Sequence, residues 1–305
     1  MKNRLLVGTR GSALALAQTN EIVEALKRIA PGMRCDIVQI RTKGDKMHEQ
    51  GATTPEGKST YTEEIEDALT AEKIDIAVHS MKDLTTDLQK GLVIAAVPER
   101  INPRDVLISR DKTKLDQLPG KARVGTSSPR RKAQLSARRG DLEIVDMHGN
   151  VDTRLKKLEK GECDAIVLAA AGLIRLRLER NVTEYLSPDV MLPAVGQGAL
   201  AVETRESSSE IIELLSKIDH ESTRMAVDAE RAFARRLGAD CRTPIAAYAR
   251  IEARKLVING LVATPNGNML VRSQIASGDI VPEKVGQELA EVLLNKGAAA
   301  ILEAA

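Results

Sequence analysis

The sequence predicts an α/β protein made of two similar lobes and a smaller α+β domain. The first sign is an apolar run at 74–78 that soon leads to a Lys-Asp pair. Such a run is typical of a buried parallel strand, and open α/β sheets bind ligands at the carboxyl ends of their strands. The second sign is a strand, turn and helix pattern at 4–30 that returns at 122–139. The third is an alternating segment at 245–277, which is typical of antiparallel strands.

Length and the pattern of apolar residues limit the class of protein. With 305 residues, the chain is long enough for two or three domains with cores of their own. No run of eighteen apolar residues occurs, so no membrane span is predicted. The basic N-terminus reaches Gly8 and Arg10 before a signal-peptide core could form, which predicts a cytosolic protein.

Cysteine, histidine and aromatic content narrow the function classes further. The chain has three widely spaced cysteines, Cys35, Cys163 and Cys241, which favours reduced thiols over a disulfide framework. No metal is predicted, because ligand spacing is lacking at His48, His79, His148 and His220. With no Trp, one Phe, three Tyr and a net charge of +2, a base-stacking nucleic-acid surface is poorly supported.

The first lobe contains a predicted anion site. Its expected elements are a strand at 4–9, a helix at 12–30, a strand at 35–41, a loop at 42–60, a helix at 61–71, and strands at 74–78 and 92–97. Ser12 is the expected N-cap of the first helix. The turn before it offers free backbone N–H groups and the guanidinium of Arg10, which suits an anion. The loop at 42–60 is long enough to predict a mobile lid.

A second lobe begins after residues 98–104, where two prolines in seven residues suggest a hinge. A strand and turn at 122–128 precede a helix at 129–139, with Ser128 as its cap. Val-Gly-Thr occurs at the end of the first strand of each lobe, and an Asp precedes an apolar run in both. These matches predict two similarly built lobes, and chance similarity is the alternative.

Cations are dense in the second lobe. A solvated helix face explains most of them, since they alternate with leucines at amphipathic spacing. It explains Arg130 and Arg131 less well, because the helix dipole disfavours cations in a first turn. Their position suggests a multiply charged anionic ligand held by guanidinium forks.

The rest of the chain predicts a return to the first lobe and then a third domain. A glycine-marked loop and strand at 192–203 lead back, so that two crossings join the lobes as a hinged pair. A helix at 222–237, antiparallel strands at 245–277 with a turn at 265–267, and a helix at 282–302 make a small α+β domain.

Several long motifs, in one order, resemble hydroxymethylbilane synthases, also called porphobilinogen deaminases. They are Val-His-Ser-Met-Lys-Asp-Leu at 78–84, Val-Gly-Thr-Ser-Ser at 124–128 with the two arginines after it, Gly-Asn-Val at 149–151 with Thr-Arg-Leu at 153–155, residues 192–198, and Cys241. The resemblance implies two periplasmic-binding-protein-like lobes joined by a hinge, plus a small α+β C-terminal domain. The corresponding domains are 1–98 with 199–217, 104–193, and 221–305.

The resemblance also implies the chemistry. Such enzymes, which are transferases of porphyrin and heme biosynthesis, join four porphobilinogen molecules head to tail with loss of ammonia, and release the linear tetrapyrrole hydroxymethylbilane. Growth starts on a dipyrromethane cofactor held by a thioether, here at Cys241. Asp83 matches the catalytic carboxylate, which stabilises a cationic methylene-pyrrolenine and helps remove the pyrrole proton.

Pyrrole substrates carry acetate and propionate groups, so a growing chain needs cations. The positions that match cofactor or substrate binding in the family are Arg10, Ser12, Lys82, Thr126, Ser128, Arg130, Arg131, Arg154 and Arg175. Gln18 and Lys58 are further candidates, the latter because it lies in the expected lid.

The chain departs from the family pattern at four places. His148 stands where an arginine usually holds carboxylates, and a neutral imidazole donates one hydrogen bond only. Ser-Thr-Tyr at 59–61 replaces Gly-Leu-Phe, and Thr85 replaces a proline. Asp240 replaces a glycine before the cofactor cysteine, where an acid raises the pKa of the thiol and predicts slower cofactor attachment.

Two other functions fit part of the pattern. A two-lobed anion-binding protein without catalysis would also need the arginines, but it would not need the pairing of Asp83 with Cys241. A nucleic-acid binder would use the basic second lobe, against the scarcity of aromatics and the near-zero net charge. The expected partners are therefore porphobilinogen alone, with neither nucleic acid nor membrane, and nothing demands more than a monomer.

Overall fold

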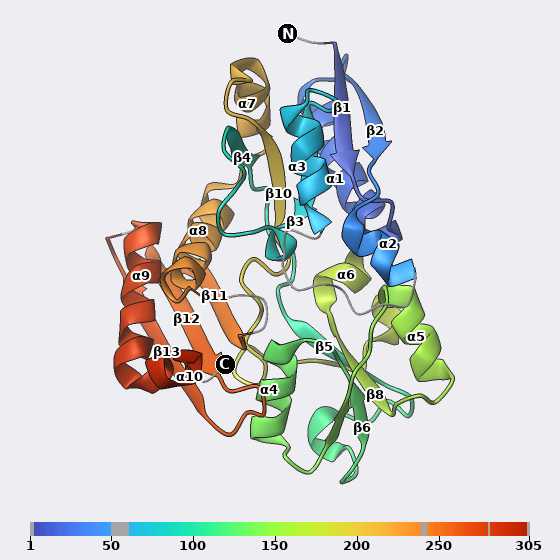
Figure 1. Ribbon diagram of the computed structural model, residues 1–305, viewed down its shortest axis with the longest axis vertical. Coiled ribbons are helices and arrows are strands. Elements are labelled where there is room, and N and C mark those ends of the chain that lie inside the picture. Colours follow the sequence, from blue (N-terminus) through green and yellow to red (C-terminus); the bar gives the residue numbers. More distant parts are fainter. Residues whose placement is uncertain (1–2, 50–60, 239–242, 280, 304–305) are drawn as a thin grey trace. The chain divides into compact units, whose positions relative to one another are not determined.

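The computed structural model describes residues 3–49, 61–238, 243–279 and 281–303 (Figure 1). It divides into two compact units. The first contains Met1–Ile101 and Ala199–Arg224, and the second contains Asn102–Gly198 and Met225–Ala305. The chain thus returns to the first unit after residue 198, as the sequence predicts, before it enters the second unit again.

The first unit is a five-stranded mixed sheet in the order β2-β1-β3-β10-β4. The strands are β1 (Arg4–Thr9), β2 (Arg34–Gln39), β3 (Ile76–Ser80), β4 (Leu92–Ala96) and β10 (Leu200–Arg205). β1 is parallel to β2 and β3, whereas β10 is antiparallel to β3 and β4. The expected parallel pairing of β3 is therefore confirmed on one side only.

Helices cover both faces of this sheet. The helices of this unit are α1 (Ala13–Ile29), α2 (Lys43–Glu49), α3 (Glu63–Thr70) and α7 (Ser209–Ser216), of which α1, α3 and α7 pack on the sheet. Ile22 and Leu26 of α1 pack with Val78 of β3 and with α7 in one core cluster. Leu69 of α3 packs with Ala77 in another. Because alternate residues of a strand face opposite sides, β3 contributes to both clusters.

The second unit contains a sheet of the same design, in the order β7-β6-β8-β5-β9. Its strands are β5 (Asp105–Ser109), β6 (Arg123–Gly125), β7 (Glu143–Val145), β8 (Ala165–Ala169) and β9 (Glu184–Tyr185). Its helices are α4 (Pro129–Arg138), α5 (Val151–Glu159) and α6 (Ala170–Arg175). β6 is parallel to β7 and β8, and β5 is antiparallel to β8 and β9. Every strand therefore has a counterpart in the first unit.

The two sheets share hydrogen bonds as well as strand order. The Asp75 carboxylate accepts from the N–H of Leu6 at 2.8 Å, and the Asp164 carboxylate accepts from the N–H of Arg123 at 2.8 Å. Each acid lies just before the central strand, and each donor lies in the strand beside it. The expectation of two similarly built lobes is confirmed, since chance would not reproduce both topology and contacts.

A third sheet and three helices complete the second unit. The strands β11 (Ile245–Glu252), β12 (Lys255–Ala263) and β13 (Leu270–Ser277) are antiparallel. The helices are α8 (Glu221–Arg236), which belongs to this unit from Met225 on, α9 (Pro282–Leu293) and α10 (Ala299–Glu303). Phe233 of α8 and Leu289 of α9 are fully buried against β12. The β12–β13 turn also meets α4, because a Cβ at Gly267 would lie 2.3 Å from the Ala133 carbonyl oxygen.

Three expectations about secondary structure were wrong or incomplete. The segment at 42–60 contains α2, so it is not a loop over its described part. The helix at 282–302 is broken, since Gly297 has φ +104°. The short elements β5, β7, β9, α6 and α7 were not predicted, because two to eight residues carry too little periodicity.

Candidate active site

In the first unit, a pocket lies at the carboxyl ends of β1 and β3. Four sequence-predicted residues line it together: Arg10, Ser12, Gln18 and Asp83. The other lining residues are Leu14, Ala15, Tyr61, Thr62, Val78, His79 and Ser80. This is the edge of the sheet at which a ligand is expected.

Local chemistry explains how the pocket is built. Ser12 is the N-cap of α1, where its Oγ accepts from the N–H of Ala15 at 3.2 Å, as predicted. Gln18 donates from Nε2 to the Oγ of Ser80 at 2.6 Å, which ties α1 to the end of β3. These contacts fix the two walls of the pocket.

Asp83 closes a short 3₁₀ turn, Met81–Asp83, which follows β3 directly. Met81 is buried and donates its N–H to the carbonyl of Ala199 at 3.1 Å, so the turn is held against β10. The Asp83 side chain is partly exposed, and no residue in the described part of the chain pairs with its carboxylate. The carboxylate is therefore available to a ligand. Lys82, the next residue back, is partly buried and lies outside the pocket lining.

Arg10 is already paired within its unit. Its Nε and Nη2 donate to the carboxylate of Asp45 in α2, with Nη2 and Oδ1 2.5 Å apart. The ring of Tyr61 covers the guanidinium at 4.2 Å from its centroid. Burial alone would raise the pKa of Asp45, but Arg10 and hydrogen bonds from Thr42 outweigh it and lower that pKa. Sequence reasoning missed Asp45, whose partner is 35 residues away.

A buried acidic cluster lies beside the pocket. His79 Nε2 is 3.1 Å from the Glu203 carboxylate, and both side chains are almost fully buried. Glu66 of α3 is also buried; this burial, together with the nearby charge of Glu203, raises its pKa. Nothing in the sequence marked either acid, except that Glu203 interrupts an apolar strand.

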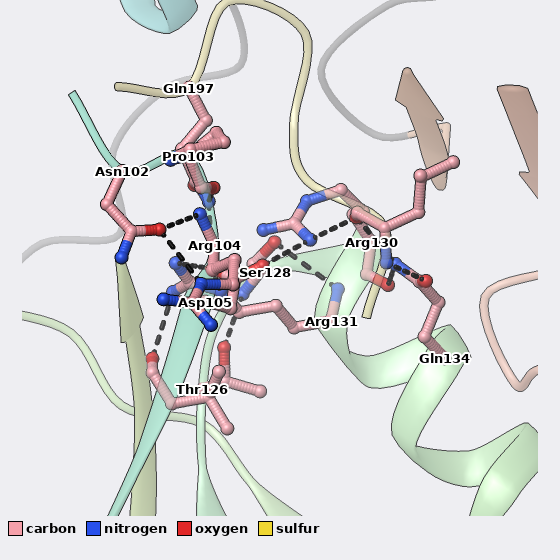
Figure 2. Close-up of polar contacts among 12 residues, drawn as sticks. Asn102, Pro103, Arg104, Asp105, Thr126, Ser128, Arg130, Arg131, Gln134 and Gln197 are labelled. Atoms are coloured by element: carbon pink, nitrogen blue, oxygen red, sulfur yellow. Dashed lines mark hydrogen bonds and ion pairs between the residues drawn. The ribbon is translucent and has the colours of Figure 1, made fainter. Parts of the chain in front are cut away.

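In the second unit, the cations Arg130 and Arg131 meet Asp105 at the start of β5 (Figure 2). Arg130 Nη1 donates to Oδ2 at 2.7 Å, and Arg131 Nη2 donates to Oδ1 at 2.6 Å. Burial alone would raise the pKa of Asp105, but the two guanidinium groups lower it from 3.8 to about 2. The protein thus supplies one counter-charge itself, whereas the sequence analysis predicts that a ligand supplies all of the negative charge. One positive charge remains unbalanced in this trio.

Residues 192–198 form a loop that also contacts the trio of Asp105, Arg130 and Arg131. Gln197 donates from Nε2 to Asp105 at 3.2 Å and to the carbonyl of Pro103 at 2.7 Å (Figure 2). Arg130 Nη1 also donates to the carbonyl of Leu192 at 2.7 Å. The loop is anchored to α8, because the buried Glu230 accepts from the N–H of Gly196 at 2.6 Å. Gln197 and Glu230 were not predicted as site residues.

The other predicted residues of the second unit lie around the same end of the sheet. Ser128 caps α4 through its Oγ, and the buried Thr126 accepts from the N–H of Ser128 at 3.3 Å. Arg175 donates to the carbonyl of Gly198 at 3.3 Å. Arg154 donates instead to the carbonyl of Gly149 at 2.7 Å.

For four residues of the sequence analysis, the structure gives no support to the expected role. His148 is exposed, and its carbonyl accepts from Lys157. Lys58 and Cys241 lie outside the described residues, as does Asp240. Within the described ranges, no group of three or more His, Cys, Asp or Glu side chains could hold a metal ion.

Comparisons with known proteins agree along the whole chain. Residues 5–213 match the family model "Porphobilinogen deaminase, dipyromethane cofactor binding domain", and residues 224–295 match "Porphobilinogen deaminase, C-terminal domain". A porphobilinogen deaminase of Pelotomaculum thermopropionicum is 48% identical over 305 residues, which is 100% of this chain and 98% of that protein. One from Syntrophotalea carbinolica is 47% identical, over 98% of this chain and 95% of that protein.

The second unit suits the cofactor that the family model names. The carboxylate groups of a dipyrromethane require cations and N–H or O–H donors. The trio keeps a net positive charge, and the buried Nε of Arg130 has no hydrogen-bond partner in the described residues. Thr126 and Ser128 add hydroxyl groups at the same helix N-terminus. With both family models and these relatives in agreement, the chain belongs to the porphobilinogen deaminase family.

Proposed function

We propose that this chain acts as a hydroxymethylbilane synthase. It joins four porphobilinogen molecules head to tail, releases one ammonia at each step, and frees the linear tetrapyrrole with water. The observation that supports this reaction best is Asp83, a carboxylate unpaired among the described residues, in a pocket that also contains Ser12 and Gln18. A reaction through a cationic intermediate needs such a free carboxylate.

Asp83 serves two steps in this proposal. When the carbon–nitrogen bond of porphobilinogen breaks, its electron pair leaves with ammonia, and the carboxylate stabilises the methylene cation that remains. After the new carbon–carbon bond forms, the same carboxylate accepts the proton that the pyrrole carbon loses.

The dipyrromethane cofactor, when bound, supplies the pyrrole carbon to which the first substrate is joined. We assign its thioether to Cys241, as the family resemblance implies. The other two cysteines are poorly suited, because burial raises the pKa of the thiols of Cys35 and Cys163. A raised pKa leaves less thiolate to form the bond.

Substrate and cofactor carboxylates bind to the remaining candidates. In the first unit these are Arg10, Ser12, Gln18, Lys82 and, outside the described residues, Lys58. In the second unit they are Thr126, Ser128, Arg130, Arg131, Arg154, Arg175 and His148. Asp105 neutralises only part of the charge of the arginine pair, so it leaves cationic N–H groups for a ligand.

The experiment compares wild-type protein with Asp83→Asn and Asp83→Glu, and measures porphobilinogen consumption and tetrapyrrole release. Loss of the charge in Asp83→Asn lowers kcat by roughly 10²-fold or more, whereas Asp83→Glu retains part of it. Asp87→Asn, an exposed acid four residues on, is the control. Binding of porphobilinogen with no conversion by the wild-type protein would instead support the anion-binding alternative.

We also propose that the enzyme works as a cytosolic monomer. None of the described helices is long and apolar enough to cross a membrane. The near-zero net charge gives no general attraction to nucleic acid or anionic lipid. Light scattering on the eluting peak of a sizing column measures the mass, and a dimer would contradict this proposal.

A further inference from the structure

One side chain has no role in the reaction described above, yet it contacts a residue that does. Asp45 lies in the first turn of α2, and its carboxylate meets the guanidinium of Arg10 in the pocket. The two side chains are 19% and 23% exposed, so water screens this ion pair only partly.

The pairing uses one particular edge of the guanidinium. Arg10 donates from Nε to Oδ1 at 3.2 Å and from Nη2 to Oδ1 at 2.5 Å. This side-on fork leaves the Nη1 edge of Arg10 for other acceptors. Because Arg10 lines the pocket, a carboxylate that enters there has that remaining edge to bind.

Two further contacts fix the plane of the guanidinium. The Tyr61 ring covers it at 4.2 Å, which is a cation–π distance. Gly44 lies under the same ring, where a Cβ would come within 2.2 Å of the Tyr61 Cε1. The absence of a side chain at residue 44 therefore lets the ring approach α2. Tyr61 then covers a face of the Arg10 guanidinium, while Asp45 accepts from its Nε and Nη2.

Asp45 is itself held in place. The Thr42 Oγ1 donates to its Oδ2 at 2.8 Å, and the Thr42 N–H donates to the same oxygen at 3.2 Å. Lys43 joins α2 to α3 through an ion pair with Glu63 at 3.0 Å. Because these contacts restrain Asp45, we expect its carboxylate to stay paired with Arg10 when the substrate binds.

We propose that Asp45 is a positioning residue, which with Tyr61 fixes Arg10 so that its free edge binds a carboxylate group of porphobilinogen. This inference rests on the proposed function. Its benefit is preorganisation: a guanidinium already held in the binding geometry loses less rotamer freedom when the substrate binds. In the competing interpretation, Asp45 competes with the substrate carboxylate for Arg10. Loss of the Asp45 charge would then lower KM for porphobilinogen rather than raise it.

The test is the kinetics of the holoenzyme with Asp45→Asn, which keeps the shape and removes the charge. We expect KM for porphobilinogen to rise about tenfold, equivalent to about 1.4 kcal/mol, with kcat within about twofold. Asp45→Glu restores part of the affinity. Tyr61→Leu raises KM more than Tyr61→Phe, because phenylalanine keeps the ring. Glu24→Gln removes an exposed ion pair on α1 and is the matched control. An unchanged or lower KM in Asp45→Asn overturns the proposal.

A second readout does not depend on turnover. In the ¹⁵N spectrum of the holoenzyme, the Nε–H signal lost in Arg10→Lys belongs to Arg10. We expect the Nε–H proton of Arg10 to exchange slowly with solvent in the wild type and rapidly in Asp45→Asn. The two proteins should have comparable melting temperatures. Equal exchange rates would contradict the side-on pairing. A wild type that does not convert porphobilinogen refutes the proposed function, whereas this spectrum still tests the geometry.

Discussion

Asp105 forms ion pairs with two buried arginines, Arg130 and Arg131. Its carboxylate is fully buried and accepts from Arg130, Arg131 and Gln197. Removal of one partner from a buried ion pair leaves an uncompensated charge, which costs more than the pair contributes. At this position the chain therefore has little tolerance for substitution.

Asp105→Asn should lower the free energy of unfolding by roughly 3–5 kcal/mol. The change leaves two buried guanidinium groups without their counter-charge. Urea unfolding at neutral pH measures the loss. Asp116→Asn, which removes an exposed pair with Arg138, is the control and should cost less than about 1 kcal/mol. Equal losses in the two variants would contradict the assigned role of Asp105.

The same residue predicts a pH dependence. The pKa of Asp105 is lowered from 3.8 to about 2 in the folded protein, so the unfolded chain binds a proton first as pH falls. The stability that this residue contributes is complete above about pH 4 and is lost as pH falls toward 2. Asp105→Asn should remove this part of the acid sensitivity.

Residues whose role depends on near neighbours could be predicted from the sequence. Ser12 and Ser128 cap their helices as expected, since an N-cap needs only the next three residues. Asp105 and Asp45 could not be found in this way, because their arginines are 25 and 35 residues away. Such pairs exist only after the chain has folded.

Elements with clear periodicity were predictable, and short ones were not. The long helices α1, α4 and α8 lie within a residue or two of the expected bounds. The strands β7 and β9, with three and two residues, carry no alternation that a sequence can reveal. Their place in the sheet is set by neighbouring strands, so tertiary structure defines them.

The packing of α9 on α8 depends on a glycine. A Cβ at Gly286 would lie 2.2 Å from the carbonyl oxygen of Ala229 and 2.9 Å from the N–H nitrogen of Phe233. Gly286→Ala should push the helices apart and destabilise the protein by roughly 1–3 kcal/mol. Thermal unfolding measures the change. Gly278→Ala, where nothing lies within 4 Å, is the control and should be nearly neutral; a neutral Gly286→Ala would contradict the close packing.

At the scale of the whole molecule, one five-stranded design occurs twice. The sequence showed it only through short matches, in the Val-Gly-Thr turns and in the acid that precedes the central strand of each sheet. Each copy places a helix N-terminus at the carboxyl ends of its strands. One copy adds the catalytic carboxylate that we propose, and the other adds the arginine pair.

The most direct test is the intact mass of the denatured holoenzyme before and after brief exposure to porphobilinogen, followed by peptide mapping. We expect an excess equal to two linked pyrrole units on the peptide that contains Cys241. After exposure, a ladder of further pyrrole units should appear on the same peptide. A protein that stays unmodified after incubation with porphobilinogen, or that carries the excess at Cys35 or Cys163, would contradict the account.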